Sequence, residues 1–178
     1  VAAFTPYGYQ KSEENKNQLV IDEQTAPIIK DIFKMKLDGM SAAKIADVLN
    51  EKGILSPMMY KKQNGYSYAE GGYITTDNAK WSATTILRIL KNEIYTGTMV
   101  QGKKTTYNYK VKNIIKKQKK EWVYVENTHE AIVSKQEFDL VQNILFLDTR
   151  TAPFQENVYL FSGLLICADC GSRMTRKT

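Results

Sequence analysis

Residues 81–92 read Trp-Ser-Ala-Thr-Thr-Ile-Leu-Arg-Ile-Leu-Lys-Asn, a pattern that predicts a short amphipathic helix. Ser82 is a favourable N-cap, because its hydroxyl can accept a hydrogen bond from a free amide of the first turn. Thr84, Arg88 and Lys91 fall at i, i+4 and i+7, which places them on one stripe of the helix. The apolar positions recur at helical spacing and form the opposite, buried side: Ile86, Leu87, Ile89 and Leu90.

A second short helix is predicted over residues 41–50, where Ile45, Val48 and Leu49 provide an apolar face. Two short helices in this order predict a helix-turn-helix-like core. Their connection is unusually long, and we expect residues 56–80, which are rich in Tyr, Gly, Asn and Ser, to be irregular.

The polar front of the helix at 81–92 is chemically suited to reading DNA. An arginine can bond guanine in a bidentate fashion, while threonine and lysine reach bases or phosphates. The candidate reading residues are therefore Thr84, Thr85, Arg88 and Lys91. Many surface helices also carry a polar front, so an ordinary solvated face is the alternative interpretation.

The flanking segments predict further helix and a small amount of sheet. Residues 4–21 predict a short β-hairpin, and Asp22 or Thr25 can cap the helix that follows it. Ser134 and Glu137 form a capping box at the start of a later helix. The fold class is therefore α+β: a mainly helical domain with a helix-turn-helix-like core and a small antiparallel hairpin or sheet.

Positive charge is concentrated in residues 103–120, which hold eight lysines and no acidic residue. The rest of the chain has 17 basic against 19 acidic residues, although the whole chain carries a net charge of +6. The segment lies between predicted strands at 98–101 and 121–126, the second of them half-buried, so we expect it at the tip of a long hairpin. Concentrated positive charge is typical of a polyanion-binding surface, and a solvated loop is the alternative. The candidate phosphate contacts are Lys103, Lys104, Lys110, Lys112, Lys116, Lys117, Lys119, Lys120 and the tail residues Arg173, Arg176 and Lys177.

The stretch Cys167-Ala168-Asp169-Cys170-Gly171 predicts one corner of a zinc site. Two thiolates leave such a turn on the same side, and the glycine allows the backbone to fold tightly around a metal. Cys167 and Cys170 are the only cysteines, and the chain ends eight residues after the second. We therefore expect the chain to stop inside a zinc-binding module; two free thiols are the alternative.

No catalytic constellation is found in the sequence. It has one histidine, His129, for which a structural hydrogen bond is the favoured role, and it has no glycine-rich phosphate loop. Trp81 and Trp122 are expected to be core anchors. The cysteine usage fits a reducing compartment, and no run of residues approaches the length of a membrane span.

Taken together, these motifs resemble the recombinase domain of large serine recombinases. They match in order and spacing over nearly the whole chain: Pro6-Tyr7-Gly8-Tyr9, Leu19-Val20-Ile21-Asp22, Ala26-Pro27-Ile28-Ile29, Ser41-Ala42-Ala43-Lys44-Ile45-Ala46, Leu49-Asn50-Glu51-Lys52-Gly53-Ile54, Trp81-Ser82-Ala83-Thr84-Thr85-Ile86, Ile89-Leu90-Lys91-Asn92, Tyr95-Thr96-Gly97, His129-Glu130-Ala131-Ile132-Val133, Leu160-Phe161-Ser162-Gly163-Leu164-Leu165 and the Cys167–Gly171 turn.

The resemblance implies a part of a larger DNA-recombining enzyme. In that family a separate N-terminal domain carries the serine nucleophile, and the recombinase domain and a zinc ribbon bind attachment-site DNA. The implied divisions are a recombinase domain at 1–148, a linker at 149–158 and the beginning of a truncated zinc ribbon at 159–178. Zn²⁺ is the implied cofactor of the full-length protein, and no residue of this chain is expected to be catalytic.

The resemblance also implies double-stranded DNA as the partner, a dimer on DNA, a tetramer in synapsis and a cytoplasmic protein of bacterial or phage origin. Two other classes fit the residues alone. One is a helix-turn-helix transcription regulator with a zinc-ribbon appendage. The other is a basic protein-interaction module whose lysine hairpin docks an acidic partner.

Overall fold

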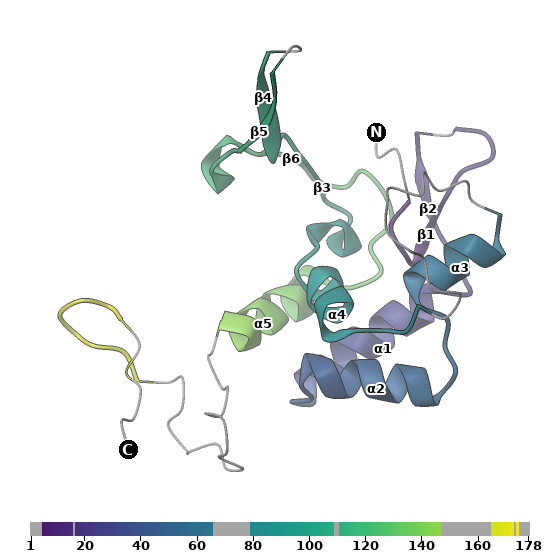
Figure 1. Ribbon diagram of the computed structural model, residues 1–178, viewed down its shortest axis with the longest axis horizontal. Helices are drawn as coiled ribbons and strands as arrows, with labels where there is room; N and C mark the ends of the chain where they lie inside the picture. The colour runs from purple at the N-terminus through teal and green to yellow at the C-terminus, as the bar shows by residue number, and fades with distance from the viewer. Residues whose placement is uncertain are drawn as a thin grey trace.

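The computed structural model describes residues 5–15, 17–65, 79–108, 111–146, 165–172 and 174. Small antiparallel sheets are combined with a group of helices, as the sequence predicts (Figure 1). In chain order the elements are β1 (Tyr9–Lys11), β2 (Leu19–Ile21), α1 (Ala26–Leu37), α2 (Ala42–Glu51), α3 (Pro57–Gln63), α4 (Ala83–Leu90), the 3-10 turn η1 (Glu93–Thr96), β3 (Met99–Gln101), β4 (Lys104–Asn108), β5 (Val111–Lys116), the 3-10 turn η2 (Lys119–Glu121), β6 (Val123–Val125) and α5 (Lys135–Phe146).

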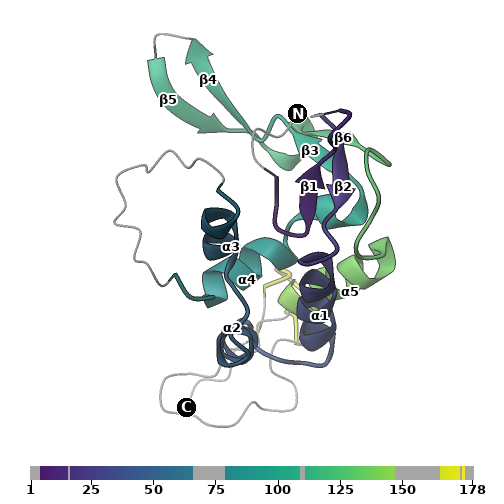
Figure 2. The same ribbon diagram turned by 90° about the vertical axis from the view of Figure 1, so that its right-hand side faces the viewer.

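The core lies between α1, α2, α4 and α5. Helix α4 packs against α2 along much of its length and also touches α1 and α5 (Figure 2). Removal of apolar side chains from water holds these helices together. The side chains that are almost completely buried include Ile29 and Ile32 of α1, Ile45 and Leu49 of α2, Ile86 and Leu90 of α4, and Val141 of α5.

Local capping fixes where these helices begin. The Ser41 and Ser82 hydroxyls accept hydrogen bonds from the amides of Lys44 and Thr85, which satisfies a free donor of each first turn. The capping box before α5 is present, because the Ser134 amide donates to Glu137 and the Glu137 amide donates to the Ser134 hydroxyl. These three helix starts confirm the predictions from sequence.

The start of α1 differs from the simple cap that the sequence predicts. Thr25 occupies the N-cap position without accepting a capping bond. Its hydroxyl instead donates to Asp22 Oδ2 at 2.6 Å and accepts from the Gly8 amide at 3.1 Å. The threonine thereby joins the β1–β2 hairpin to the first helix.

Helix α3 corrects the expectation of an irregular stretch at 56–80. Ser56 caps it by accepting from the Met59 amide, and Pro57 stands in the first turn, where its missing amide costs nothing. The hydroxyl of Tyr60 donates to Asp22 Oδ2 at 2.7 Å. The Ser-Pro pair was a helix-start signal that the Tyr- and Gly-rich composition of the stretch obscured. Residues 66–78 lie outside the described part of the chain.

The long lysine hairpin is confirmed. β3 pairs antiparallel with β6, with Met99 opposite Val125, and β4 pairs antiparallel with β5, with Lys104 opposite Lys116. The β4–β5 ribbon extends away from the helices in both views (Figures 1 and 2). The prediction is wrong in one respect. The side chains of β6 are exposed and not half-buried, since Val123 is 56% exposed and Val125 is 49% exposed.

Candidate nucleic-acid interface

Helix α4 presents the polar front that its sequence predicts. Thr84, Arg88 and Lys91 are exposed, while Ile86 and Leu90 on the opposite side are fully buried. Thr85 is half-buried, and its hydroxyl lies 3.0 Å from the Ser82 hydroxyl, so part of its hydrogen-bonding capacity is used at the cap. Lys91 is the C-cap residue and no longer has helical geometry. The exposed stripe therefore consists of Thr84, Arg88 and Lys91.

The direction of this front is fixed by a side-chain clamp between α2 and α4. Asn50 accepts a hydrogen bond from the Trp81 amide at 2.8 Å and donates to the Trp81 carbonyl at 3.1 Å. The Trp81 indole donates to the Ile54 carbonyl at 2.9 Å, and its side chain is only 3% exposed. Trp81 is the core anchor that the sequence predicts, and it holds the start of α4 against the end of α2.

The hairpin brings four of the candidate lysines together at the base of the β4–β5 ribbon. Lys104 faces Lys116, and the Lys117 amide donates to the Lys103 carbonyl at 3.0 Å, which continues the same register. Lys119 and Lys120 lie instead on η2, outside the ribbon. The backbone of Lys112 belongs to β5, whereas Lys110, Arg173, Arg176 and Lys177 lie outside the described residues.

Trp122 corrects another expectation, because it is a half-buried residue at the hairpin base and not a core anchor. Its indole donates to the Lys117 carbonyl at 3.0 Å. The Lys103 ammonium lies 5.0 Å from the centre of its ring, a cation–π distance. Trp122 also stacks on Tyr124, with ring centres 6.4 Å apart.

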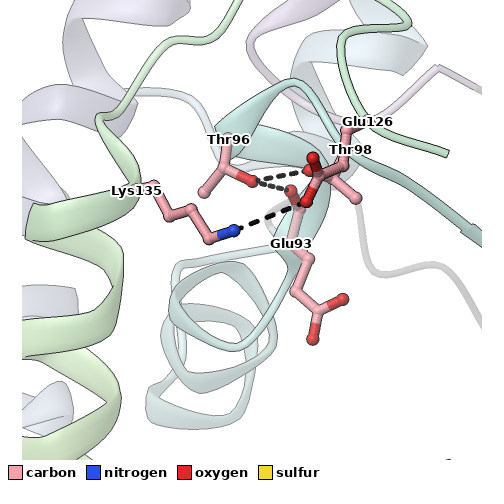
Figure 3. A network of polar contacts seen from close by, with 5 residues as sticks. All are labelled: Glu93, Thr96, Thr98, Glu126 and Lys135. Carbon is pink, nitrogen blue, oxygen red and sulfur yellow. Dashed lines mark hydrogen bonds and ion pairs between the residues drawn. The ribbon is translucent and has the colours of Figure 1, made fainter. Parts of the chain in front are cut away.

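A small polar network ties the hairpin base to the helical body (Figure 3). The Thr96 hydroxyl donates to the Glu93 carbonyl at 2.8 Å, and its oxygen lies 3.3 Å from the Thr98 hydroxyl. Lys135 at the start of α5 pairs with Glu126 after β6 at 3.4 Å. Both partners of that ion pair are well exposed, so its contribution to stability is small.

The Glu93 carboxylate points away from this network in Figure 3. Its Oε2 atom is buried without a hydrogen-bond partner among the described residues. The pKa of the Tyr124 phenol is raised, first by loss of hydration and then by the negative charge of Glu93. The negative charge of Glu93 therefore disfavours the Tyr124 phenolate and keeps the phenol protonated.

Cys167 and Cys170 lie on a tight turn that is closed by Gly171. Gly171 adopts a left-handed backbone with φ 66°, and its amide donates to the Cys167 carbonyl at 3.0 Å. Hydrogen bonds to Ser172 and Cys167 lower the pKa of the Cys170 thiol, which favours the thiolate that binds metals. Among the described residues no third His, Cys, Asp or Glu completes a ligand group, so the pair alone does not make a structural zinc site.

His129 has the structural role that the sequence favours. Its two ring nitrogens lie 2.8 Å from the Thr128 hydroxyl and 2.6 Å from the Ile94 carbonyl. Its ring also meets Tyr9 edge-on at 4.9 Å. Both nitrogens are thus engaged in holding the segment after β6 against η1.

Comparison with known proteins identifies the family. Residues 23–146 match the family model described as Recombinase. A Bacillus subtilis (strain 168) protein named "Putative DNA recombinase" is 30% identical over 181 residues, covering 96% of this chain and 33% of the relative. Another protein of that strain, "Uncharacterized protein YefB", is 33% identical over 95 residues, covering 53% of this chain and 31% of the relative. The chain belongs to the recombinase family.

Two solved structures share the fold. One is a complex of a large serine recombinase (LSR) with DNA, with a TM-score of 0.50, 20% identity and coverage of 96% of this chain and 42% of the other. The second, from work on the sequence requirements of the Listeria innocua prophage attP site, has a TM-score of 0.51 and 19% identity, and the match covers 96% of this chain and 55% of the other. The chain spans about a third of the length of the first curated relatives it matches. Within the described residues, no helix is both long and apolar enough to cross a bilayer.

Proposed function

We propose that this chain is the attachment-site-binding part of a large serine recombinase and that strand cleavage belongs to a different domain of the parent protein. The observation that carries the proposal is the exposed Thr84/Arg88/Lys91 stripe on a helix whose opposite side is locked into the core. Such a helix can enter a major groove without exposing apolar surface. The DNA-bound structural relative supports the same class of partner.

The roles within the interface follow from geometry and charge. Arg88 reads base edges, with Thr84 and Lys91 beside it, while the lysines of the hairpin contact phosphates. Phosphate contacts release counterions and give affinity in every sequence, whereas base contacts discriminate between sequences. In this proposal α4 provides specificity for the DNA sequence, and the hairpin provides salt-dependent affinity for any DNA.

The test is Arg88→Ala in the 178-residue chain, measured by fluorescence anisotropy. Two duplexes serve as probes. The first is a site that the wild-type chain selects from a random-sequence library, and the second is a scrambled version of that site. A lost bidentate contact is expected to weaken binding to the selected site about tenfold and to leave the scrambled site nearly unchanged. Lys34→Ala, on the helix α1, is the matched control for the loss of one exposed charge. Equal weakening on both duplexes would make Arg88 a phosphate contact only, and no binding at low salt would favour the protein-interaction module.

We also propose that Cys167 and Cys170 supply two ligands of a zinc site that other residues of the parent protein complete. Supporting this are the left-handed Gly171 and the lowered pKa of the Cys170 thiol. Metal analysis of this chain is expected to find far less than one zinc per molecule, because two thiolates do not satisfy tetrahedral zinc. A stoichiometric zinc content that Cys170→Ser leaves intact would refute the assignment.

A further inference from the structure

The two faces of the β4–β5 ribbon have the same composition but different surroundings. Directly opposed residues share a face, and side chains alternate between faces along each strand. One face carries Lys104, Thr106, Ile114 and Lys116, which we call the open face. The other carries Lys103, Thr105, Ile115 and Lys117, which we call the braced face.

Trp122 distinguishes the two faces. The Lys103 ammonium lies over its ring, and its indole N–H donates a hydrogen bond to the Lys117 carbonyl. The braced face is therefore covered at its base. Lys103 and Lys117 are accordingly half-buried, whereas Lys104 and Lys116 are exposed. The isoleucines differ in the same direction: Ile114 on the open face is 64% exposed, and Ile115 on the braced face is 40% exposed.

The charges of the open face are not compensated within the part of the protein that the structure describes. Like charges directly opposite each other on paired strands destabilise a hairpin, and Lys104 faces Lys116. On the braced face the Trp122 ring offsets the charge of Lys103. Among the described residues no carboxylate lies within ion-pair distance of Lys104 or Lys116. The open face thus combines an unneutralised cation pair with a protruding isoleucine.

We propose that the ribbon is laid on duplex DNA by its open face, with Lys104 and Lys116 on phosphates and Ile114 packed on the groove surface between them. This inference rests on the proposed DNA-binding function and specifies which surface of the hairpin carries it out. A two-stranded ribbon fits a DNA groove. Many architectural proteins contact the base steps of a groove with an apolar side chain and use basic side chains beside it. The braced face points away from the duplex and keeps the ribbon in the required orientation.

The experiment compares matched variants that remove the same charge from opposite faces. Lys104→Gln/Lys116→Gln and Lys103→Gln/Lys117→Gln are tested in the 178-residue chain against a fluorescein-labelled mixed-sequence duplex over a range of salt. Log affinity falls linearly with log salt. For the open-face pair the magnitude of this slope is expected to decrease by about 2, which is roughly 0.9 for each lost phosphate contact. The braced-face pair is expected to change the slope by less than half of that.

A second pair separates groove contact from general attraction to a polyanion. Ile114→Ala is expected to weaken duplex binding about fivefold. Ile115→Ala, its neighbour on the braced face, is expected to have little effect. Heparin, which has no base-pair groove, should bind both isoleucine variants as it binds the wild type. A cooperative urea transition and a far-ultraviolet circular dichroism spectrum like that of the wild type confirm that each variant is folded.

The outcomes distinguish this inference from the function on which it rests. Equal slopes for the two lysine pairs, or equal losses for the two isoleucine variants, would overturn the open-face assignment while leaving DNA binding in place. An Ile114→Ala effect that is as large on heparin as on DNA would also overturn it. A wild-type chain that does not bind the duplex even at low salt would refute the proposed function itself.

Discussion

At the scale of single residues, the left-handed Gly97 marks a place where the chain has no room for a side chain. Gly97 follows η1 with φ +80°, and a Cβ built there would lie 2.8 Å from the His129 carbonyl oxygen. That approach allows the Thr128 amide to donate to the Gly97 carbonyl at 3.0 Å, which fixes the segment after β6. Gly39 has a similar φ of +88° but nothing within 4 Å of the corresponding position.

Gly97→Ala and Gly39→Ala therefore form a matched pair. Gly39→Ala is expected to lower the free energy of unfolding by about 1–2 kcal/mol, the cost of a left-handed alanine. Gly97→Ala is expected to cost clearly more, because the methyl group also collides with backbone that cannot rotate away. Urea denaturation followed by circular dichroism measures both values. Equal losses would show that the His129 segment shifts freely.

At the scale of elements, the α2–α4 pair is the unit that presents the candidate reading helix. Its apolar contact is reinforced by the Asn50 amide, which satisfies both main-chain groups of Trp81. The helix-turn-helix interpretation explains the contact between the two helices. It does not anticipate α3, which lies between them in the sequence and reaches Asp22 through Tyr60.

Asn50→Ala tests the clamp. The substitution leaves the Trp81 amide and carbonyl without their partner, and we expect a loss of about 1–3 kcal/mol in the free energy of unfolding. Asn143→Ala, an exposed asparagine on α5, serves as the control and should change stability by less than about 0.5 kcal/mol. If both variants have the same urea midpoint, water replaces the Asn50 amide without cost.

At the scale of the whole molecule, three buried tyrosines join the N-terminal hairpin to the rest. The Tyr95 hydroxyl donates to the Tyr7 carbonyl at 3.0 Å, and the Tyr9 hydroxyl donates to the Glu130 carbonyl at 2.8 Å. Tyr7 also meets Trp81 edge-on at 5.5 Å. Burial is the main cause that raises the pKa of all three phenols well above the usual value.

Alkaline pH is therefore expected to destabilise the protein. The unfolded chain releases phenolic protons near pH 10, whereas the native state retains them. The free energy of unfolding should be unaffected by these groups below about pH 9 and should fall as pH rises above about 10. Urea titrations across this range measure the fall, and Tyr95→Phe should make it shallower. Phenolate absorbance that develops fully in the native protein near pH 10 would contradict the prediction.

Much of the helical structure was predictable because its signals are local. Ser41, Ser82 and the Ser134–Glu137 box mark helix starts through bonds spanning a single turn. Trp122 was not predictable in the same way. An apolar residue before alternating β positions fits a core site equally well, and its true role depends on a lysine nineteen positions away in the sequence.

The sequence by itself determined the amphipathic front of α4 and the concentration of lysines in one hairpin, because periodicity and charge are properties of the chain. It could not determine which face of that hairpin is free. The two faces carry identical residue types, Lys, Thr, Ile and Lys, and no pattern separates them. Only the tertiary structure decided this, because the Trp122 ring folds over one face and leaves Lys104, Ile114 and Lys116 exposed on the other.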